Sequence, residues 1–283
     1  MTAERLARWL LPLLVVLSIA PLLLVANNSL RSTGTIYQDP LAAFFSAASG
    51  SPETGGWAEV TRRNYLGAWR EIGPYLLNTL WVCVMSSLLA VLSSLLIAFA
   101  FAFGRFPGRR WIEHPYRLAL LVPGSLLIIP TYLVVRSLGL LNSYSALIIP
   151  YAVGGMVFGV FLLRAAMRSI PRELLEAAQM DGAGPWTCLW QVILPQVRAT
   201  CSVIALMTFL GSWNNFLWPY LVNSDPSLHV ISSGLYFLSD TDAASDLGML
   251  YAAYVLAILP LAVLFLVFTR QFVGGLTAGA VKE

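Results

Sequence analysis

Six long apolar runs, separated by polar stretches, dominate the chain. They cover residues 9–26, 72–104, 118–135, 137–163, 199–224 and 247–269, and none of them contains Asp, Glu, Lys, Arg or His. A helix needs about 20 apolar residues to cross a hydrocarbon core of roughly 30 Å. None of the runs alternates as a barrel strand would, and a membrane span must satisfy its own backbone hydrogen bonds. The pattern therefore predicts an all-α polytopic membrane protein with six transmembrane helices.

The first run has a second interpretation as a cleaved signal peptide. Arg5 and Arg8 precede it, as basic residues precede a signal core. Its length is at the upper end for such a core, and no clear small-x-small cleavage site closes it. We therefore favour a retained first helix and keep the signal peptide as the alternative.

Basic residues predict the orientation of the chain. With the N-terminus in the cytosol, six spans place both termini there, and cytosolic segments of membrane proteins are rich in Lys and Arg. Most of the 17 basic residues then lie inside: Arg5, Arg8, Arg105, Arg109, Arg110, Arg117, Arg164, Arg168, Arg172, Arg198, Arg270 and Lys282. The net charge of +3 thus reflects topology and does not indicate nucleic-acid binding.

The polar stretches divide the chain into three predicted regions. Residues 1–71 form the first transmembrane helix and an external loop, in which 57–69 is a possible short interfacial helix. Residues 72–270 form a core of five transmembrane helices. Residues 271–283 form a Gly-rich cytosolic C-terminal tail, which we expect to be extended. The three cysteines have no metal-ligand spacing, so we expect them to be small buried packing residues.

Several classes of chemistry lack the residues they need. Ion-driven carriers usually place ionisable groups within their spans, which makes ion coupling less favoured here, although neutral oxygens at broken helices still leave sodium open. A P-loop needs a Gly-Lys-Ser/Thr sequence, and the only lysine is Lys282. The two histidines, His114 and His229, fall on opposite sides of the membrane in this topology. We expect neither catalysis nor a bound cofactor, and any ATP would be hydrolysed by a partner.

A short helix with clear ends is predicted between the fourth and fifth runs. Pro171 suits a first helical turn, Glu173 suits the positive end of a helix dipole, and Gly182 and Gly184 are expected to end it. Leu174, Leu175 and Ala178 are predicted to form one apolar face. Hydropathy alone favours an amphipathic helix on the membrane surface, whereas an exposed apolar stripe also suits a groove in a partner protein.

This segment resembles the EAA motif of ABC importer permeases. Glu-Ala-Ala, a glycine and a later Leu-Pro follow in the expected order, with Val192 where isoleucine is usual. The resemblance implies the type I importer permease fold, with this segment as the cytosolic coupling helix that docks on an ATPase subunit. The docking residues it implies are Glu173, Leu174, Glu176, Ala177, Ala178, Asp181, Gly182, Ala183, Leu194 and Pro195.

A narrower resemblance concerns carbohydrate-importer permeases of the maltose-type G subunit. The stretch 211–219, Gly-Ser-Trp-Asn-Asn-Phe-Leu-Trp-Pro, and the tail 271–282 are similar to that subfamily. In the subfamily the tail reaches the ATPase subunits, which implies contacts for Thr277, Gly279 and Lys282. Aromatic faces and amides suit sugars, so residues predicted along a substrate pathway are Asn78, Trp213, Asn214, Asn215 and Trp218. The same residues are also ordinary interfacial anchors and helix contacts.

The resemblance also implies partners and a location. We expect a second homologous permease, two ATP-binding cassette subunits that bind ATP and Mg, an external solute-binding protein, and a bacterial or archaeal plasma (inner) membrane. The expected substrate is a carbohydrate. A glycerophosphodiester or polyol is the alternative substrate, and a membrane scaffold without its own pathway is the alternative function.

Overall fold

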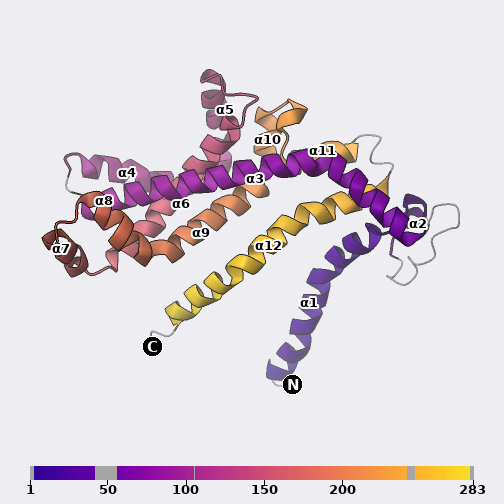
Figure 1. Ribbon diagram of the computed structural model, residues 1–283, viewed down its shortest axis with the longest axis horizontal. Coiled ribbons are helices and arrows are strands. Elements are labelled where there is room, and N and C mark those ends of the chain that lie inside the picture. The colour runs from indigo at the N-terminus through magenta and orange to yellow at the C-terminus, as the bar shows by residue number, and fades with distance from the viewer. Residues whose placement is uncertain (1–2, 42–55, 105, 241–245, 281–283) are drawn as a thin grey trace. The chain divides into compact units, whose positions relative to one another are not determined.

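The computed structural model describes residues 3–41, 56–104, 106–240 and 246–280. These residues are folded mainly into helices (Figure 1). The α-helices are α1 (Ala3–Asn28), α2 (Thr33–Gln38), α3 (Trp57–Phe103), α4 (Arg109–Ala119), α5 (Ile128–Ser137), α6 (Ser145–Arg168), α7 (Arg172–Met180), α8 (Pro185–Thr187), α9 (Leu194–Trp213), α10 (Leu217–Val222), α11 (Ile231–Asp240) and α12 (Leu247–Ala280). The described residues also form the 3₁₀ turns η2 (Gly124–Leu127) and η4 (Pro226–Leu228) and the π-helical segment η3 (Cys188–Ile193).

Each predicted apolar run falls on helical structure. Within the described residues, four helices are long and apolar enough to span a membrane: 58–103, 145–168, 185–213 and 247–266. The first and third runs correspond to the shorter apolar helices Pro12–Asn28 and Gly124–Ser137. The fold class predicted from the sequence is confirmed in its helical nature and its apolar spans.

Three boundaries differ from the prediction. Residues 57–69 do not form a separate interfacial helix, because they continue without a break into α3. The fifth span begins at Pro185 instead of residue 199, since α8, η3 and α9 run on from one another. The tail is helical through Ala280 where an extended chain was predicted. The glycines of this stretch each cost a helix about 1 kcal/mol. The stretch has no proline, however, and its Leu and Ala residues are good helix formers, so the helix continues.

The chain forms two compact units. The first comprises residues 1–76 and 233–270, and the second comprises residues 77–232 and 271–283.

In the second unit, α6 packs closely against α3 and α9. Gly155 and Gly159 form a Gly-x-x-x-Gly pair, a spacing that lets helix backbones approach in membranes. A β-carbon at Gly155 would clash with Thr208 and Ala90, and one at Gly159 would clash with Ser94 and Ile204. The Ser94 hydroxyl lies 3.3 Å from the Met156 carbonyl oxygen. The two glycines therefore set the separation of three helices.

In the same unit, an apolar core connects α3, α6, α7, η3 and α9. Its fully buried members include Leu163 and Met167 of α6, Leu189 and Ile193 of η3, and Ile204 of α9. Cys83, Cys188 and Cys201 are all buried free thiols, which confirms their prediction as small packing residues. Because side chains from five elements share this closely packed core, movement of one of these elements displaces the others.

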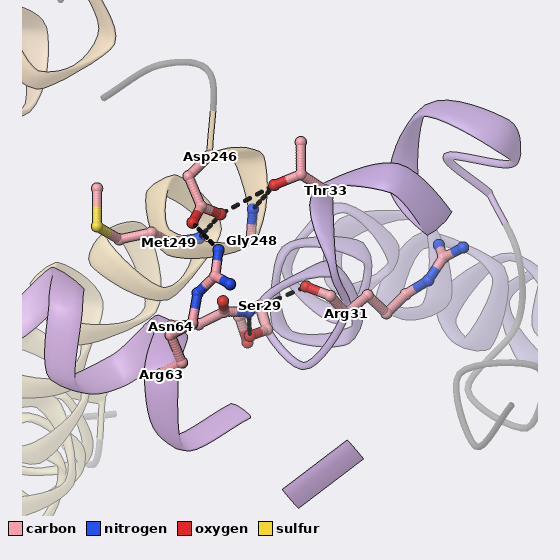
Figure 2. Close-up of polar contacts among 8 residues, drawn as sticks. All are labelled: Ser29, Arg31, Thr33, Arg63, Asn64, Asp246, Gly248 and Met249. Atoms are coloured by element: carbon pink, nitrogen blue, oxygen red, sulfur yellow. Dashed lines mark hydrogen bonds and ion pairs between the residues drawn. The ribbon is translucent and has the colours of Figure 1, made fainter. Parts of the chain in front are cut away.

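In the first unit, a polar cluster holds the end of α1, α2, α3 and the start of α12 together (Figure 2). The Asn64 amide donates to the carbonyl oxygens of Ser29 and Arg31, at 3.0 and 2.9 Å. The Asp246 carboxylate accepts from Arg63 at 3.0 Å, from the Thr33 hydroxyl at 2.9 Å and from the Met249 backbone at 3.2 Å. Asp246 thus bridges three segments that are distant in sequence.

Replacing Asp246 by asparagine is expected to lower the free energy of unfolding by about 1 kcal/mol at pH 7, because it removes the carboxylate charge that pairs with Arg63, whose side chain is 75% exposed and so screened by solvent. Partial burial raises the pKa of Asp246, but the hydrogen bonds from Arg63, Thr33 and Met249, with the Arg63 charge, hold that pKa below its ordinary value. A lowered pKa in the folded state means that this stability is present above the unfolded-state pKa, near 4, and is lost as the pH falls below it.

The measurement is the unfolding midpoint of purified wild-type and Asp246→Asn protein between pH 3 and pH 7. The difference between the two proteins should shrink as the pH falls from 7 to 3. Glu59→Gln is the matched control, since Glu59 makes only an exposed 3.4 Å pair with Arg62. A wild-type advantage that is as large at pH 3 as at pH 7, or that equals the Glu59→Gln effect, would contradict this role.

Candidate functional site

The predicted docking segment is helix α7, at one end of the second unit (Figure 1). Pro171 is the N-cap, one position before the predicted first turn, and Glu173 lies in the first turn, where a carboxylate suits the helix dipole. The Ala183 backbone donates to the Ala178 carbonyl and Gly182 donates to Gln179, at 2.9 and 3.0 Å. This pair of bonds is a Schellman motif. Gly182 has a φ of +83°, which confirms the predicted helix end and explains the glycine.

The two sides of α7 are chemically different. Leu175 is only 7% exposed and joins the apolar core, whereas Leu174 is 45% exposed. The predicted single face of Leu174, Leu175 and Ala178 is therefore wrong, because neighbouring helical residues point about 100° apart. Ala178 is half-buried on the inner side, while Ala177 is exposed.

The outward face combines small, apolar and acidic side chains. Spacings of three and four residues place Glu173, Ala177 and Met180 together on that side of the helix. Met180 is 88% exposed, and Trp186 of α8 is also exposed just beyond the helix end. Among the other implied docking residues, Glu176, Asp181 and Gly182 are exposed and Ala183 is half-buried. Ala177 leaves room for a close approach, and Met180 can adapt to an irregular partner surface.

The inner side of α7 connects the outward face to α9. Leu175 packs in the same core as Leu189 and Ile193 of the π-helical segment η3. Leu194 is half-buried against this core, and Pro195 is exposed in the first turn of α9. Leu194 and Pro195 therefore lie where the connecting segment enters a long apolar helix. π-helical turns occur frequently at functional sites.

A buried ionic cluster in the same unit ties α4 to α6. An Arg164 guanidinium nitrogen lies 2.5 Å from the Glu113 carboxylate, and the Arg109 Nε lies 3.3 Å from the same oxygen. Arg109 also donates to the Gly104 carbonyl at 3.2 Å. The Arg164 guanidinium stands over the Phe101 ring, 5.8 Å from its centroid. The cluster fixes the last turns of α6, from which the chain continues into α7.

The residues predicted for a substrate pathway are mostly engaged in contacts within the second unit. Asn78 donates to the carbonyl oxygens of Ser227 and His229 at 2.8 and 2.9 Å and accepts from Tyr144 at 2.7 Å. The Trp218 indole donates to the Ala146 carbonyl at 2.9 Å.

Of the remaining three, Trp213 is buried and stacks on Phe209, with the ring centroids 5.6 Å apart. Asn215 accepts from the Trp218 backbone at 3.1 Å. Asn214, at the end of α9, is exposed while its amide donates to the Leu210 carbonyl. Of the five predicted residues, Asn214 therefore has the most accessible side chain.

The predicted ATPase-contacting tail residues lie at the C-terminal end of the chain. Lys282 lies outside the described residues, and Thr277 and Gly279 lie in the C-terminal part of α12. Reasoning from sequence missed Met180 and Trp186 on the outward side, Glu113 in the ionic cluster, and Gly155 with Gly159. The Gly-x-x-x-Gly spacing within an apolar run was a readable signal for the last pair.

A family model described as "binding-protein-dependent transport system inner membrane component" matches residues 79–277. The chain belongs to this family. It is therefore a multi-pass membrane protein and a permease component of a transport system, a non-enzymatic role. The matched range contains α7 and the helices that position it.

Two named relatives match nearly the whole chain, and a third matches about three quarters of it. The diacetylchitobiose uptake system permease protein NgcG of Streptomyces coelicolor is 34% identical, over 96% of this chain and 87% of its own length. The arabinooligosaccharides transport system permease protein AraQ of Halalkalibacterium halodurans is 29% identical, over 97% and 96%. The sn-glycerol-3-phosphate transport system permease protein UgpE of Yersinia pestis is 31% identical, over 78% and 79%.

Solved structures support the same fold. A chain of a bacterial ABC transporter involved in the import of the acidic polysaccharide alginate superposes with a TM-score of 0.79, at 19% identity, over 95% of this permease and 96% of that chain. A second structure, the alginate transporter in complex with an alginate pentasaccharide-bound periplasmic protein, has a TM-score of 0.56 at 18% identity. This permease therefore has the fold of an ABC importer permease.

Proposed function

We propose that this permease forms one half of the membrane pathway of an ATP-driven importer for an oligosaccharide. The observation that carries the proposal is α7, a short helix seated in the core by Leu175 and presenting Ala177 and Met180 outward. Family membership supports a binding-protein-dependent system. The names of two relatives refer to diacetylchitobiose and arabinooligosaccharides, which supports a carbohydrate substrate.

Besides this permease of the inner membrane, the proposed complex has four further subunits. Two ATPase subunits bind ATP and Mg and dock on the α7 helices, a second permease completes the pathway, and an external binding protein delivers the solute. Both termini of this chain lie in the cytosol, together with α7. The basic residues of the segments around α4 and α7 support this orientation.

The packing supports a mechanical route from α7 to the spans. When bound ATP closes the two ATPase subunits, α7 moves with them. Leu175 then displaces Leu189 and Ile193, which share its core and continue into α9. Packed cores switch between discrete arrangements instead of deforming continuously. The α9 helix and the α6 helix against it therefore move together and open the pathway to the outside.

In this scheme α7 and α8 supply the docking surface. Ala177, Met180 and Trp186 make the principal contacts with the ATPase, with Glu173 and Glu176 at the edge. The C-terminal residues Thr277, Gly279 and Lys282 reach the ATPase pair. Asn214 contacts the solute directly. Asn78, Asn215 and Trp218 shape the pathway wall, because their polar groups make hydrogen bonds within the fold. Trp213 contributes its buried ring, which stacks on Phe209.

Glycerol-3-phosphate or a related polyol phosphate is a second candidate substrate, favoured by the relative UgpE. The test is uptake into proteoliposomes containing the whole transporter and its binding protein. Labelled chitooligosaccharides, arabinooligosaccharides, alginate oligosaccharides and glycerol-3-phosphate are compared with and without internal ATP. ATP-dependent uptake of one oligosaccharide class supports the proposal. Uptake of glycerol-3-phosphate alone overturns the carbohydrate assignment, and ATP-independent uptake overturns the mechanism.

A further inference from the structure

An apolar groove opens in the second unit between α4 and α6. Its volume is about 770 Å³, which is in the range of small-molecule sites. Apolar side chains form most of its wall: Phe101, Leu120, Leu121, Phe158, Val160, Phe161 and Ala165. Leu121, Phe158 and Phe161 are all well exposed at its surface. A groove of this kind on a membrane protein faces a hydrocarbon ligand or a neighbouring apolar surface.

One end of the groove is basic. Among the described side chains that line it, Arg164 and Arg168, one turn apart on α6, are the charged ones, and none is acidic. Glu113 lies behind the wall and is shared by Arg164 and Arg109. The Glu113 carboxylate therefore pairs with two guanidinium groups, and Arg168, a third basic residue at the groove, is exposed. The surplus of positive charge favours an anionic group beside the apolar wall.

Helix α4 adds a second indication of contact with lipid. Its inner side carries the buried Glu113 and the half-buried Tyr116, whose hydroxyl donates to the Val157 carbonyl of α6. Its outer side carries Trp111, which is 85% exposed, together with Ile112 and Leu118. Tryptophan beside aliphatic and basic residues is typical of a helix at the membrane–water interface. The groove therefore opens beside a helix suited to the headgroup level of the bilayer.

We propose that this groove is a binding site for one anionic phospholipid. An acyl chain lies against Leu121, Phe158 and Phe161, and the phosphate pairs with Arg168, because a guanidinium matches phosphate geometry through two parallel hydrogen bonds. The lipid thereby packs between α4 and α6, one turn before the chain enters α7. The inference depends on the membrane location of the chain and not on its transported solute.

Photoreactive lipids test the site on the assembled transporter with its ATPase and partner permease. Phosphatidylglycerol and phosphatidylcholine, each with a photoreactive group in one acyl chain, are added to the same complex, and labelled peptides are identified by mass spectrometry. We expect phosphatidylglycerol to label Leu121, Phe158 or Phe161 about fivefold more than phosphatidylcholine does. This is the preference for an anionic headgroup that one basic residue provides.

Two variants and a matched control decide the outcome. Arg168→Gln should reduce phosphatidylglycerol labelling to the phosphatidylcholine level, while Arg198→Gln, an exposed arginine on α9, should leave it unchanged. Ala165→Trp should fill the groove and remove labelling by both lipids. Equal labelling by the two lipids, or unchanged labelling of Arg168→Gln, identifies an ordinary lipid-facing surface and overturns the proposal. Absence of labelling with either lipid shows that another subunit covers the groove and overturns it as well.

Discussion

Substitution of Ala177 by arginine is expected to reduce ATP-driven uptake at least thirtyfold while the transporter remains folded. Ala177 is exposed on the outward face of α7, between Glu173 and Met180. A bulky charged side chain at the centre of a docking surface prevents close packing and costs about 2 kcal/mol or more, which corresponds to that factor. The measurement is co-purification of the ATPase subunit, together with uptake in proteoliposomes.

The matched control is Gln179→Arg, which adds the same charge on the other side of the same helix. Gln179 lines a small pocket of about 380 Å³ with Leu175 and Arg109, so the added side chain has space. We expect near-normal association for this variant. Equal loss in both variants, or normal uptake with arginine at 177, would remove the outward face of α7 as the docking surface.

Substitution of Glu113 by alanine is expected to lower the free energy of unfolding by about 3–5 kcal/mol. Breaking a buried ion pair leaves the partner charge without compensation. The Glu113 and Arg164 side chains are 12% and 14% exposed, so solvent screens the pair weakly. The midpoint of thermal unfolding of the purified transporter, followed by circular dichroism, measures the change.

The double variant Glu113→Leu/Arg164→Met separates the charge from the space it occupies. Replacing both partners by apolar residues of similar size is often neutral, so the double variant should regain most of the loss. If the double variant is as unstable as Glu113→Ala, the effect comes from lost packing. If Glu113→Ala is as stable as wild type, the cluster does not hold α4 to α6.

Much of the helical architecture was predictable from the sequence because lipid imposes a strong constraint. Charge-free runs must be helical where no water can satisfy the backbone, and each of the six runs falls on helices. Exact ends were less predictable. The fifth span begins at Pro185, 14 residues before the predicted start. The prediction took only residues free of charge and therefore began after Arg198, which lies on the exposed side of α9.

The ends of α7 were predictable, whereas its orientation was not. Gly182 was readable as a stop signal because a left-handed residue favours glycine. The prediction placed Leu174 and Leu175 on one apolar face, although neighbouring helical residues point about 100° apart. The packing of Leu175 with η3 decides that it is the inner residue. The Glu113 cluster was also unreadable, since its partner Arg164 is 51 residues away and only the tertiary fold brings α4 beside α6.

The most direct test of the central claim is a photo-crosslink from α7 to the ATPase. Benzoylphenylalanine is placed at Met180, or at Trp111 of α4 as an equally exposed control, and the intact transporter is irradiated in membranes. The account predicts an adduct with the ATPase subunit from position 180 and none from position 111. Absence of an ATPase adduct at 180, or an adduct at 111 of equal yield, would contradict the assignment of α7 as the coupling helix.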